Sequence, residues 1–466
     1  MQHLPVVLAV LCAAVFGGVV ITAIYQRPQR GLLLLAALTP LDGLLDIAPV
    51  PGIAGAWKEG ILAVTLICAA NRRIRPSART GPPLHMPWWP AAAGLVGFGL
   101  ISAAWVYGPI GVYGIKVTFF YLFAVLALWL TPFDAQDRDR LVSIIMALGV
   151  ITTIVGIGQQ IIGPAKLVEL GYTYGEQVRS SGPLFRTFST FNQPFGFGLF
   201  VTMALLVGGA VALSDTSRRR NQLFLALWPV MAITMATSVV RAAILGLVIG
   251  VIWLAVLRFR RLVAPMLAIA ALAVVSLPFL PSSITKVFFS SSSLSQRGSG
   301  WSEIFASIGV HPLGRGLGSS GSAADAMSAA RGEDTQTVTA GAGGTVQGMS
   351  SNYQPDNYYV KVLLELGPIG LWLFLAMIVT AVIWCVQSAR RLPDPDGAFV
   401  LGVSASIIAA MAASLVATYF EIFPLDFYFW MLLGAVGCAT AQHESRTVRL
   451  HFDPGEAASR PTSANY

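Results

Sequence analysis

Two arginines beside long apolar runs are the residue types most suited to binding a charged substrate. Arg241 lies in a tight turn between two such runs, and an arginine at membrane depth is costly unless it meets an anion or a water-filled cavity. Arg186 lies in a polar, aromatic segment entering another apolar run, and its planar guanidinium can donate two hydrogen bonds to a diphosphate. We predict that Arg186 and Arg241 together hold the diphosphate of a lipid. The alternatives are contact of Arg241 with lipid headgroups and a solvated loop charge at Arg186.

Asp356 is the candidate proton acceptor. It follows Pro355 and precedes Asn357 and an apolar run that begins at Tyr358. Asp or Asn just before a helix is a frequent N-cap, so capping alone could explain this residue. The functional interpretation is a general base at the membrane surface, which takes a proton from an attacking hydroxyl while arginines hold the leaving diphosphate. One residue can fill both roles.

Other polar residues near this segment have structural explanations. Lys361 and Glu365 are four residues apart, so they share a helix face and are predicted to form an ion pair within the membrane. His311 begins the segment His-Pro-Leu-Gly-Arg-Gly-Leu-Gly and is an alternative acid or base. The glycines of that segment favour a tight turn over a phosphate cradle, because no strand-to-helix context surrounds them.

The elements that must position these residues are membrane helices. Hydrophobic residues make up 55% of the chain and charged residues 11%, and apolar runs of roughly 18 to 24 residues recur throughout. Such runs predict an all-α, polytopic membrane protein, whereas a β-barrel would show short alternating segments. The formal charge of +8 comes from arginines in short clusters between the runs, which argues against nucleic-acid binding. The cysteines lie in apolar runs without metal spacing, so we expect no disulfide and no metal site.

About twelve to thirteen spans are predicted. They lie near 4–25, 31–48, 58–70, 88–107, 110–131, 141–162, 193–213, 222–239, 241–257, 262–280, 358–386, 398–418 and 424–442. Acidic residues and prolines between 39 and 58 predict that the second and third spans form a broken or re-entrant pair.

The connections between spans predict the orientation. Arginine-rich connections all fall on one side: Arg27/Arg30, Arg72 to Arg79, Arg138/Arg140, Arg218 to Arg220, Arg258 to Arg261, Arg390/Arg391 and the tail from Arg446. By the positive-inside rule this side is cytoplasmic. The long connections 163–192 and 281–357 then face outward, and the working face is extracytoplasmic.

The chain therefore divides into four parts. Residues 1–280 hold the first ten spans, 281–357 form a long extracytoplasmic loop, 358–442 hold the last three spans, and 443–466 form a cytoplasmic tail. Within the loop, residues 319–351 are rich in Ser, Ala, Gly and Thr, which predicts a mobile flap or a disordered segment.

Four blocks in this order resemble the O-antigen ligase and polysaccharide polymerase superfamily. They are Arg186 to Phe195, Thr237 to Gly246, Arg297 to Gly318 and Asp356 to Gly370, covering roughly residues 180 to 385. The most specific parts are Arg297 with Trp301 leading to His311-Pro-Leu-Gly-Arg-Gly-Leu-Gly, and the segment from Asp356 to Gly370.

The resemblance implies a metal-independent, inverting, membrane-embedded glycosyltransferase of the GT-C type that needs no cofactor. Its donor would be a polyprenyl-diphosphate-linked glycan, and its acceptor would be another glycan. The enzyme would lie in the bilayer of a bacterial inner membrane and would have other polysaccharide-assembly proteins as partners. Arg186 and Arg241 match the arginines that bind the donor diphosphate. Asp356 stands where the ligases have histidine, so Asp-Asn resembles the polymerases more closely.

The leading hypothesis is a polymerase of surface polysaccharide with Asp356 as base. Arg297, His311 and Asn357 would support the loop or acceptor, and Tyr353 and Tyr358 would offer faces for sugar stacking. The alternative enzyme is a ligase that joins a finished glycan to a lipid or protein. From other classes, a transporter or flippase would show midplane charges and repeated halves, and an assembly scaffold would tolerate alanine at the proposed site.

Overall fold

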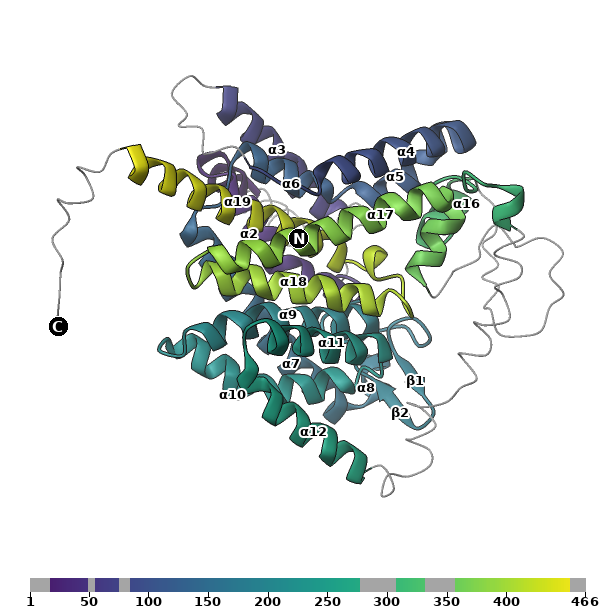
Figure 1. Ribbon diagram of the computed structural model, residues 1–466. Coiled ribbons are helices and arrows are strands. Elements are labelled where there is room, and N and C mark those ends of the chain that lie inside the picture. Colours follow the sequence, from purple (N-terminus) through teal and green to yellow (C-terminus); the bar gives the residue numbers. More distant parts are fainter. Residues whose placement is uncertain (1–16, 49–54, 75–83, 277–306, 332–356, 453–466) are drawn as a thin grey trace, which may run out of the picture.

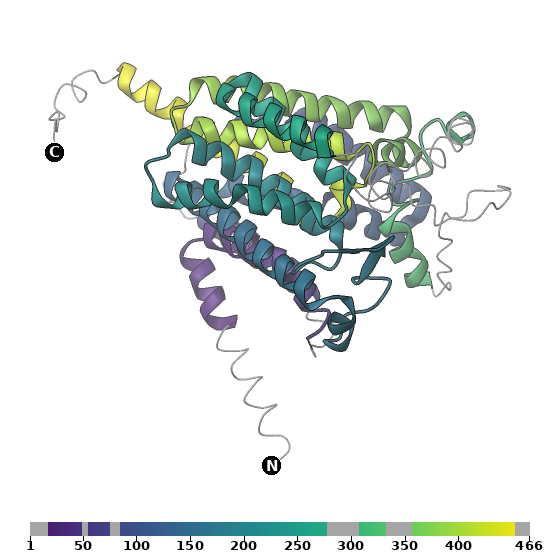
Figure 2. The same ribbon diagram turned by 90° about the horizontal axis from the view of Figure 1, so that it is seen from below.

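The protein is a bundle of helices in the computed structural model, which describes residues 17–48, 55–74, 84–276, 307–331 and 357–452 (Figure 1). Most helices lie roughly along one common axis, as the view from below shows (Figure 2). The main helices are α2 Gln29–Leu38, α3 Trp57–Ile74, α4 Trp89–Tyr107, α5 Val112–Phe119, α6 Leu122–Leu130, α7 Ala135–Ile162, α8 Pro164–Glu169, α9 Pro194–Ser214, α10 Arg219–Ala236, α11 Arg241–Leu257, α12 Val263–Ser276, α16 Ser322–Arg331, α17 Tyr358–Arg391, α18 Asp396–Ala413 and α19 Leu425–Phe452. The predicted all-α class is confirmed.

Helices α9 and α18 form the centre of the bundle. Both are buried along almost their whole length, and they pack against each other and against α11. Small residues allow the close approach: a Cβ at Gly402 of α18 would lie 2.9 Å from Val207 Cα of α9, and one at Gly246 of α11 would lie 3.0 Å from Ala409 O. Membrane helices lack a strong hydrophobic drive to associate, so such close packing contributes much of their attraction.

Among the residues that the structure describes, five stretches of helix are long and apolar enough to cross a membrane by length and composition. They are Trp89–Phe119, Ala135–Ile162, Pro194–Ser214, Tyr358–Arg391 and Asp396–Ala413. Gly17–Gln26 and Arg241–Leu257 are shorter apolar helices. The protein is therefore a multi-pass membrane protein, and the number of about thirteen spans remains a prediction.

The arginine-rich connections meet at one end of the bundle, which we call the arginine end. Ion pairs join them across the sequence: Arg27 with Asp134 and Asp137 (both 2.7 Å), Arg218 and Arg220 with Asp139 (3.0 and 3.1 Å), Arg138 with Asp396 (2.6 Å), and Arg258 with Asp394. In Figure 1 this end lies to the left, where α19 leaves the bundle. The prediction that these connections lie on one side is confirmed for the connections that the ion pairs join. Which side of the membrane they face stays a prediction.

Arg138 is the most buried of these arginines. Its side chain is 3% exposed, donates to both carboxylate oxygens of Asp396 (3.0 and 2.6 Å), and also donates to Phe133 O and Gln442 Oε1. We expect Arg138→Met to lower the free energy of unfolding by about 1–3 kcal/mol, because Gln442 Oε1 loses its donor and Asp396 loses both of its bonds to the guanidinium. Phe133 O keeps the bond from Gln442 Nε2 (3.0 Å), and Asp396 keeps access to water.

The control for this variant is Arg140→Met on the same helix. The Arg140 side chain is 46% exposed and lies 4.0 Å from Asp137. Thermal unfolding of the purified proteins should show a loss for Arg138→Met alone. Equal melting temperatures for both variants would contradict a structural role for the Arg138 contacts.

Two of the predicted spans contain a break in the helix. Helix α2 ends at Leu38 and is followed by a 3-10 helix, Thr39–Leu44, which agrees with the predicted break in this region. Helix α17 changes direction at Gly367, whose φ of 63° is outside the helical region. The next residue is Pro368. Glycine tolerates this backbone and proline cannot continue the hydrogen-bond ladder, so the pair separates a short first half from a long second half.

One sequence expectation is wrong, and the structure adds a helix extension and a hairpin to the predicted elements. Part of the segment predicted to be mobile, Ser322–Arg331, is helix α16, and its Ala323 is fully buried because it packs against α5. Helix α19 continues to Phe452, beyond the predicted end at 442, since a helix need not stop at the lipid surface. Two short strands, β1 Arg179–Ser181 and β2 Leu184–Arg186, form a hairpin with Gly182 at φ 57° in its turn.

Candidate functional site

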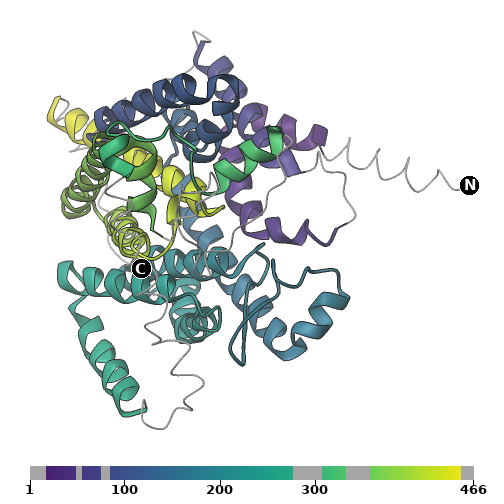
Figure 3. The same ribbon diagram turned by 90° about the vertical axis from the view of Figure 1, so that its right-hand side faces the viewer.

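The end opposite the arginine end carries most of the predicted site residues that the structure describes, and we call it the loop end. It holds the β1–β2 hairpin, the α10–α11 turn, α16 and the first turns of α17 and α19. Figure 3 views this end along the bundle, with the helices of residues 84–130 on one side and those of residues 219–276 on the opposite side.

The segments that carry Arg186 and Arg241 are joined by hydrogen bonds. Arg186 Nε donates to Ser238 O (3.1 Å), and the backbone N–H of Thr187 donates to Thr237 O (3.2 Å). The hydroxyls of Thr187 and Thr237 are 2.7 Å apart. The loop that ends in Arg186 is therefore fastened to the turn that leads into Arg241, from a sequence separation of about fifty residues.

The loop is also anchored to helices behind it. Gln159 of α7 accepts from the backbone N–H of Ser189 (2.7 Å) and donates to Ser189 O (2.8 Å). Thr190 Oγ1 donates to Pro40 O (2.5 Å). Because these bonds are buried and satisfy backbone groups, the segment around Arg186 is a rigid support for a binding residue.

The turn before Arg241 contains a strained backbone. Val239 has φ of 54°, a conformation that a β-branched residue rarely adopts. It is held by Ser238, whose hydroxyl donates to Met235 O (2.6 Å) and accepts from the N–H of Val240 (3.3 Å). Strain of this kind persists where surrounding contacts enforce it, and it is frequent at functional sites.

Arg186 is partly buried, and the groups that it contacts directly are neutral. Burial lowers the pKa of its guanidinium to about 10, with Arg179 lowering it further, yet the group stays charged near neutral pH. Its described contacts are the Ser238 carbonyl and the ring of Phe195, 5.3 Å from the guanidinium carbon. Among the described residues no carboxylate forms an ion pair with Arg186, so an anionic ligand would offset the cost of burying this charge.

Helix N-termini reinforce the positive character of this place. Arg241 is the first residue of α11, and Pro194 is the first of α9, which also begins at the loop end. The two starts are adjacent, because a Cβ at Gly198 would lie 2.8 Å from Ser238 Oγ and 3.4 Å from Val240 Cβ. The partial positive charges of two helix N-termini therefore add to the two arginines.

Asn357 is the N-cap of α17. Capping was one of the two explanations that the sequence allowed for Asp356. Its side-chain oxygen accepts from the backbone N–H of Tyr359 (2.9 Å) and of Val360 (3.2 Å). Asp356, Tyr353 and Arg297 lie outside the described residues. Their predicted roles stay predictions.

Tyr358 is a core residue in this structure. It is 5% exposed, its backbone N–H donates to Ser414 O (2.9 Å), and its ring packs against Phe374 and Phe420 at 5.3 and 5.1 Å between centroids. A ring with these neighbours stabilises the start of α17 against the end of α18, and it presents no open face for sugar stacking.

His311 is exposed and begins a loop that docks on the broken helix α17. The N–H groups of Arg315 and Gly316 donate to Leu364 O (2.8 Å) and Glu365 O (3.0 Å), carbonyls that the break leaves without helical partners. Gly314 has φ of 87°, and a Cβ there would lie 2.3 Å from Glu365 O. The segment is thus a tight turn, as predicted, and it lies against α4, α5 and α17, whereas Arg186 and Arg241 lie beside α9 and α11.

The predicted ion pair on α17 is confirmed and has a third member. Lys361 Nζ lies 2.8 Å from Glu365 and 2.8 Å from Glu421, and all three side chains are at most 5% exposed. The N–H and hydroxyl of Ser320 donate to Glu365 Oε1 (3.1 and 3.0 Å). Sequence reasoning did not identify Glu421, although an acidic residue between two apolar runs was a usable signal.

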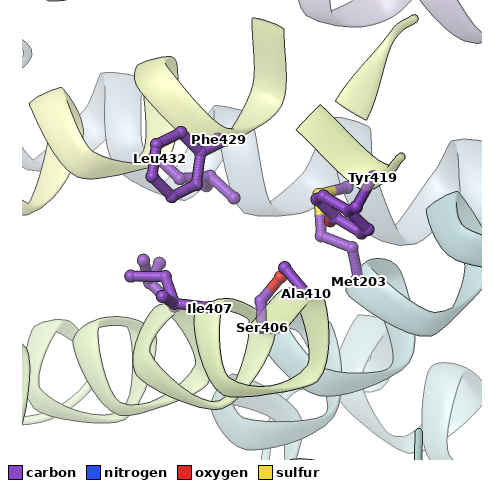
Figure 4. A pocket seen from close by; sticks show the side chains of 8 residues that line it. Met203, Ser406, Ile407, Ala410, Tyr419, Phe429 and Leu432 are labelled. Atoms are coloured by element: carbon purple, nitrogen blue, oxygen red, sulfur yellow. The ribbon is translucent and has the colours of Figure 1, made fainter. Parts of the chain in front are cut away.

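A small pocket in the bundle centre is not a substrate site. It lies between α9, α18 and α19 and is lined by Met203, Val403, Ser406, Ile407, Ala410, Tyr419, Phe429 and Leu432 (Figure 4). Its volume of about 10 Å³ corresponds to at most a single water molecule.

The fold and site together define the class. A multi-pass helical membrane protein places two arginines and adjacent helix N-termini at one end of its bundle, which suits an anionic, lipid-linked substrate. The model of the O-antigen ligase family matches residues 225–375, from α10 to the second half of α17. This match confirms the resemblance to the O-antigen ligase and polymerase superfamily and indicates a membrane enzyme of polysaccharide assembly. No curated protein matches the chain.

Proposed function

We propose that this protein transfers a glycan from a polyprenyl-diphosphate donor to a hydroxyl of an acceptor glycan, and so extends a surface polysaccharide. The observation that carries the proposal is the hydrogen-bonded union of the Arg186 segment with the turn that leads into Arg241, beside two helix N-termini. The family match adds the polysaccharide context.

In this proposal the two arginines hold the donor diphosphate at the loop end, which faces the extracytoplasmic side of a bacterial inner membrane. The acceptor oxygen attacks the anomeric carbon as the bond from this carbon to the diphosphate oxygen breaks. Asp356 takes the hydroxyl proton, and the electron pair leaves with the polyprenyl diphosphate, whose charge Arg186 and Arg241 stabilise. A single displacement of this kind inverts the anomeric centre and needs no metal.

Asp356 belongs to this proposal by its sequence position. It directly precedes Asn357, which caps α17 next to the end of α18. The end of α18 packs on the start of α11, since Gly246 of α11 approaches Ala409 of α18. Residue 356 is the last residue before the cap of α17, and α17 starts near the end of α18, which packs on the helix of Arg241. This sequence position supports Asp356 as the base.

The test is reconstitution of purified protein with a polyprenyl-diphosphate-linked oligosaccharide, comparing wild type with Asp356→Asn. We expect wild type to convert this single substrate into a ladder of chain lengths, and Asp356→Asn to lower the rate by about 10²- to 10⁴-fold. Gel separation and mass measurement of the products provide the readout.

The same assay decides between the two enzymes. The name of the matched family favours a ligase, and transfer only after addition of a separate lipid or glycan acceptor would establish that activity instead. Unchanged turnover by Asp356→Asn would remove this residue from the mechanism. Absence of any transfer, with glycan movement across the membrane, would favour a flippase.

A further inference from the structure

A second polar pocket at the loop end is lined by residues other than the two arginines. It is a cavity of about 170 Å³ between the starts of α3 and α19, the α5–α6 junction and the rim of α16. Its lining consists of Lys58, Glu59, Lys116, Val117, Phe120, Tyr121, Ser322, Glu421, Phe423 and Asp426. The function proposed above assigns this cavity no role.

The lysines of the cavity are already neutralised. Lys58 lies 3.2 Å from Asp42, and Lys116 lies 2.8 Å from Glu59. Glu421 is paired with Lys361 beneath the cavity. Charged residues of the lining comprise two lysines and three carboxylates, so the cavity disfavours a phosphate or another anion.

Two carboxylates of the cavity retain capacity to accept hydrogen bonds. Asp426 is 8% exposed, accepts from the N–H of Phe427 at Oδ1 (2.8 Å), and forms no ion pair with any described residue. Glu59 Oε2 is buried without a hydrogen-bond partner among the described residues. Buried acceptors without donors are costly, and a ligand that brings hydroxyl groups would satisfy them.

Aromatic rings form the apolar part of the lining. Tyr121 and Phe423 lie 5.7 Å apart between centroids, and Lys58 Nζ lies 3.9 Å above the Phe423 ring. A neutral sugar fits this lining, because its hydroxyls can donate hydrogen bonds to the carboxylates and its C–H faces can pack against the aromatic rings. A metal ion fits less well, because the described residues contain no group of three or more potential ligands arranged to hold one.

The cavity and the arginines lie on two sides of the start of α9. Phe195 lies beneath the Arg186 guanidinium, and a Cβ at the next residue, Gly196, would lie 3.5 Å from Phe423 O. Phe423 in turn lines the cavity. A glycan bound in the cavity is therefore close to a diphosphate bound by Arg186.

We propose that this cavity binds a sugar residue of the acceptor glycan, with Asp426 accepting hydrogen bonds from its hydroxyls and the half-buried rings of Phe120 and Phe423 packing against its ring. This inference rests on the transferase function proposed above, because it assigns the acceptor to a place distinct from the donor diphosphate. Asp426 is a binding residue here.

The experiment measures direct binding of two probes to purified protein in lipid nanodiscs. The first probe is a lipid-free oligosaccharide from the surface polysaccharide of the source organism, followed by saturation-transfer NMR. The second is inorganic pyrophosphate, followed by phosphorus NMR. The variants are Asp426→Asn and Ser322→Phe, the latter filling the cavity from its exposed rim without touching a buried charge, and Glu169→Gln is the exposed carboxylate control.

We expect Asp426→Asn and Ser322→Phe to weaken oligosaccharide binding by about tenfold or more and to leave pyrophosphate binding unchanged. Glu169→Gln should resemble wild type for both probes. Absence of oligosaccharide binding to wild type, or equal binding by both folded cavity variants, would overturn the proposal. Loss of pyrophosphate binding in Asp426→Asn would assign the cavity to the donor.

This readout is independent of the transfer assay. If the oligosaccharide binds and depends on the cavity while no transfer occurs, then the proposed reaction fails and the sugar site stands. If transfer occurs while the cavity variants bind the oligosaccharide normally, the reaction stands and the sugar site fails.

Discussion

Replacing Arg186 by glutamine is expected to lower kcat/KM for the polyprenyl-diphosphate donor by about 10²- to 10³-fold, the usual effect of removing a donor that stabilises developing charge. Arg186 is partly buried, so its charge is less screened than in water and its interaction with a leaving diphosphate is correspondingly stronger. The effect should fall on kcat as well as on KM, because charge on the diphosphate increases as the glycosidic bond breaks.

Arg186→Lys separates charge from geometry. Lysine keeps the charge but cannot donate in the planar fork, and it would lose the Nε contact to Ser238 O that fixes the side chain. We therefore expect partial activity, between that of wild type and that of Arg186→Gln.

The control for both variants is Arg179→Gln. Arg179 pairs with Arg186 across the β1–β2 hairpin, but its Nε donates to Glu176 O (2.6 Å) at a more exposed position. Its loss should change kcat/KM less than about threefold. A large effect at Arg179 with none at Arg186 would reverse the assignment, and equal small effects would remove both residues from the donor site.

Replacing Lys361 by methionine is expected to lower the free energy of unfolding by about 3–5 kcal/mol. The change removes the only described cation that contacts Glu365 and Glu421, and it leaves two carboxylates buried without compensation. The loop from His311 to Ser320 should loosen as well, because Ser320 donates to Glu365 and the neighbouring N–H groups donate to the carbonyls of α17.

Two comparisons make this prediction specific. The triple variant Lys361→Met, Glu365→Gln, Glu421→Gln should recover much of the lost stability, since no unpaired charge stays buried. Lys166→Met, which removes an exposed ion pair with Glu169, should leave the melting temperature unchanged. Thermal unfolding of the purified variants provides the measurement, and wild-type stability of Lys361→Met would show that the three charges do not act together.

The sequence by itself determined the frame of this protein. Apolar runs predicted the helices. Helix α11 begins at Arg241 and ends at Leu257, as expected, because Arg241 and Arg258 mark the two ends of its apolar run. Arginine-rich connections predicted one end of the bundle, since connections after alternate spans return to the same side. Spacing of four residues predicted the contact of Lys361 with Glu365, because helix geometry is local.

Only the tertiary structure decided which distant segments meet. The contact of Arg186 with Ser238, the approach of Glu421 to Lys361, and the cavity around Asp426 all join residues from different helices. Helical periodicity states which face of one helix is apolar, but it does not state which neighbour covers that face. The rotation, tilt and order of the helices follow from the packing of small residues such as Gly246 and Gly402 against particular partners, and these contacts exist only once the bundle has formed.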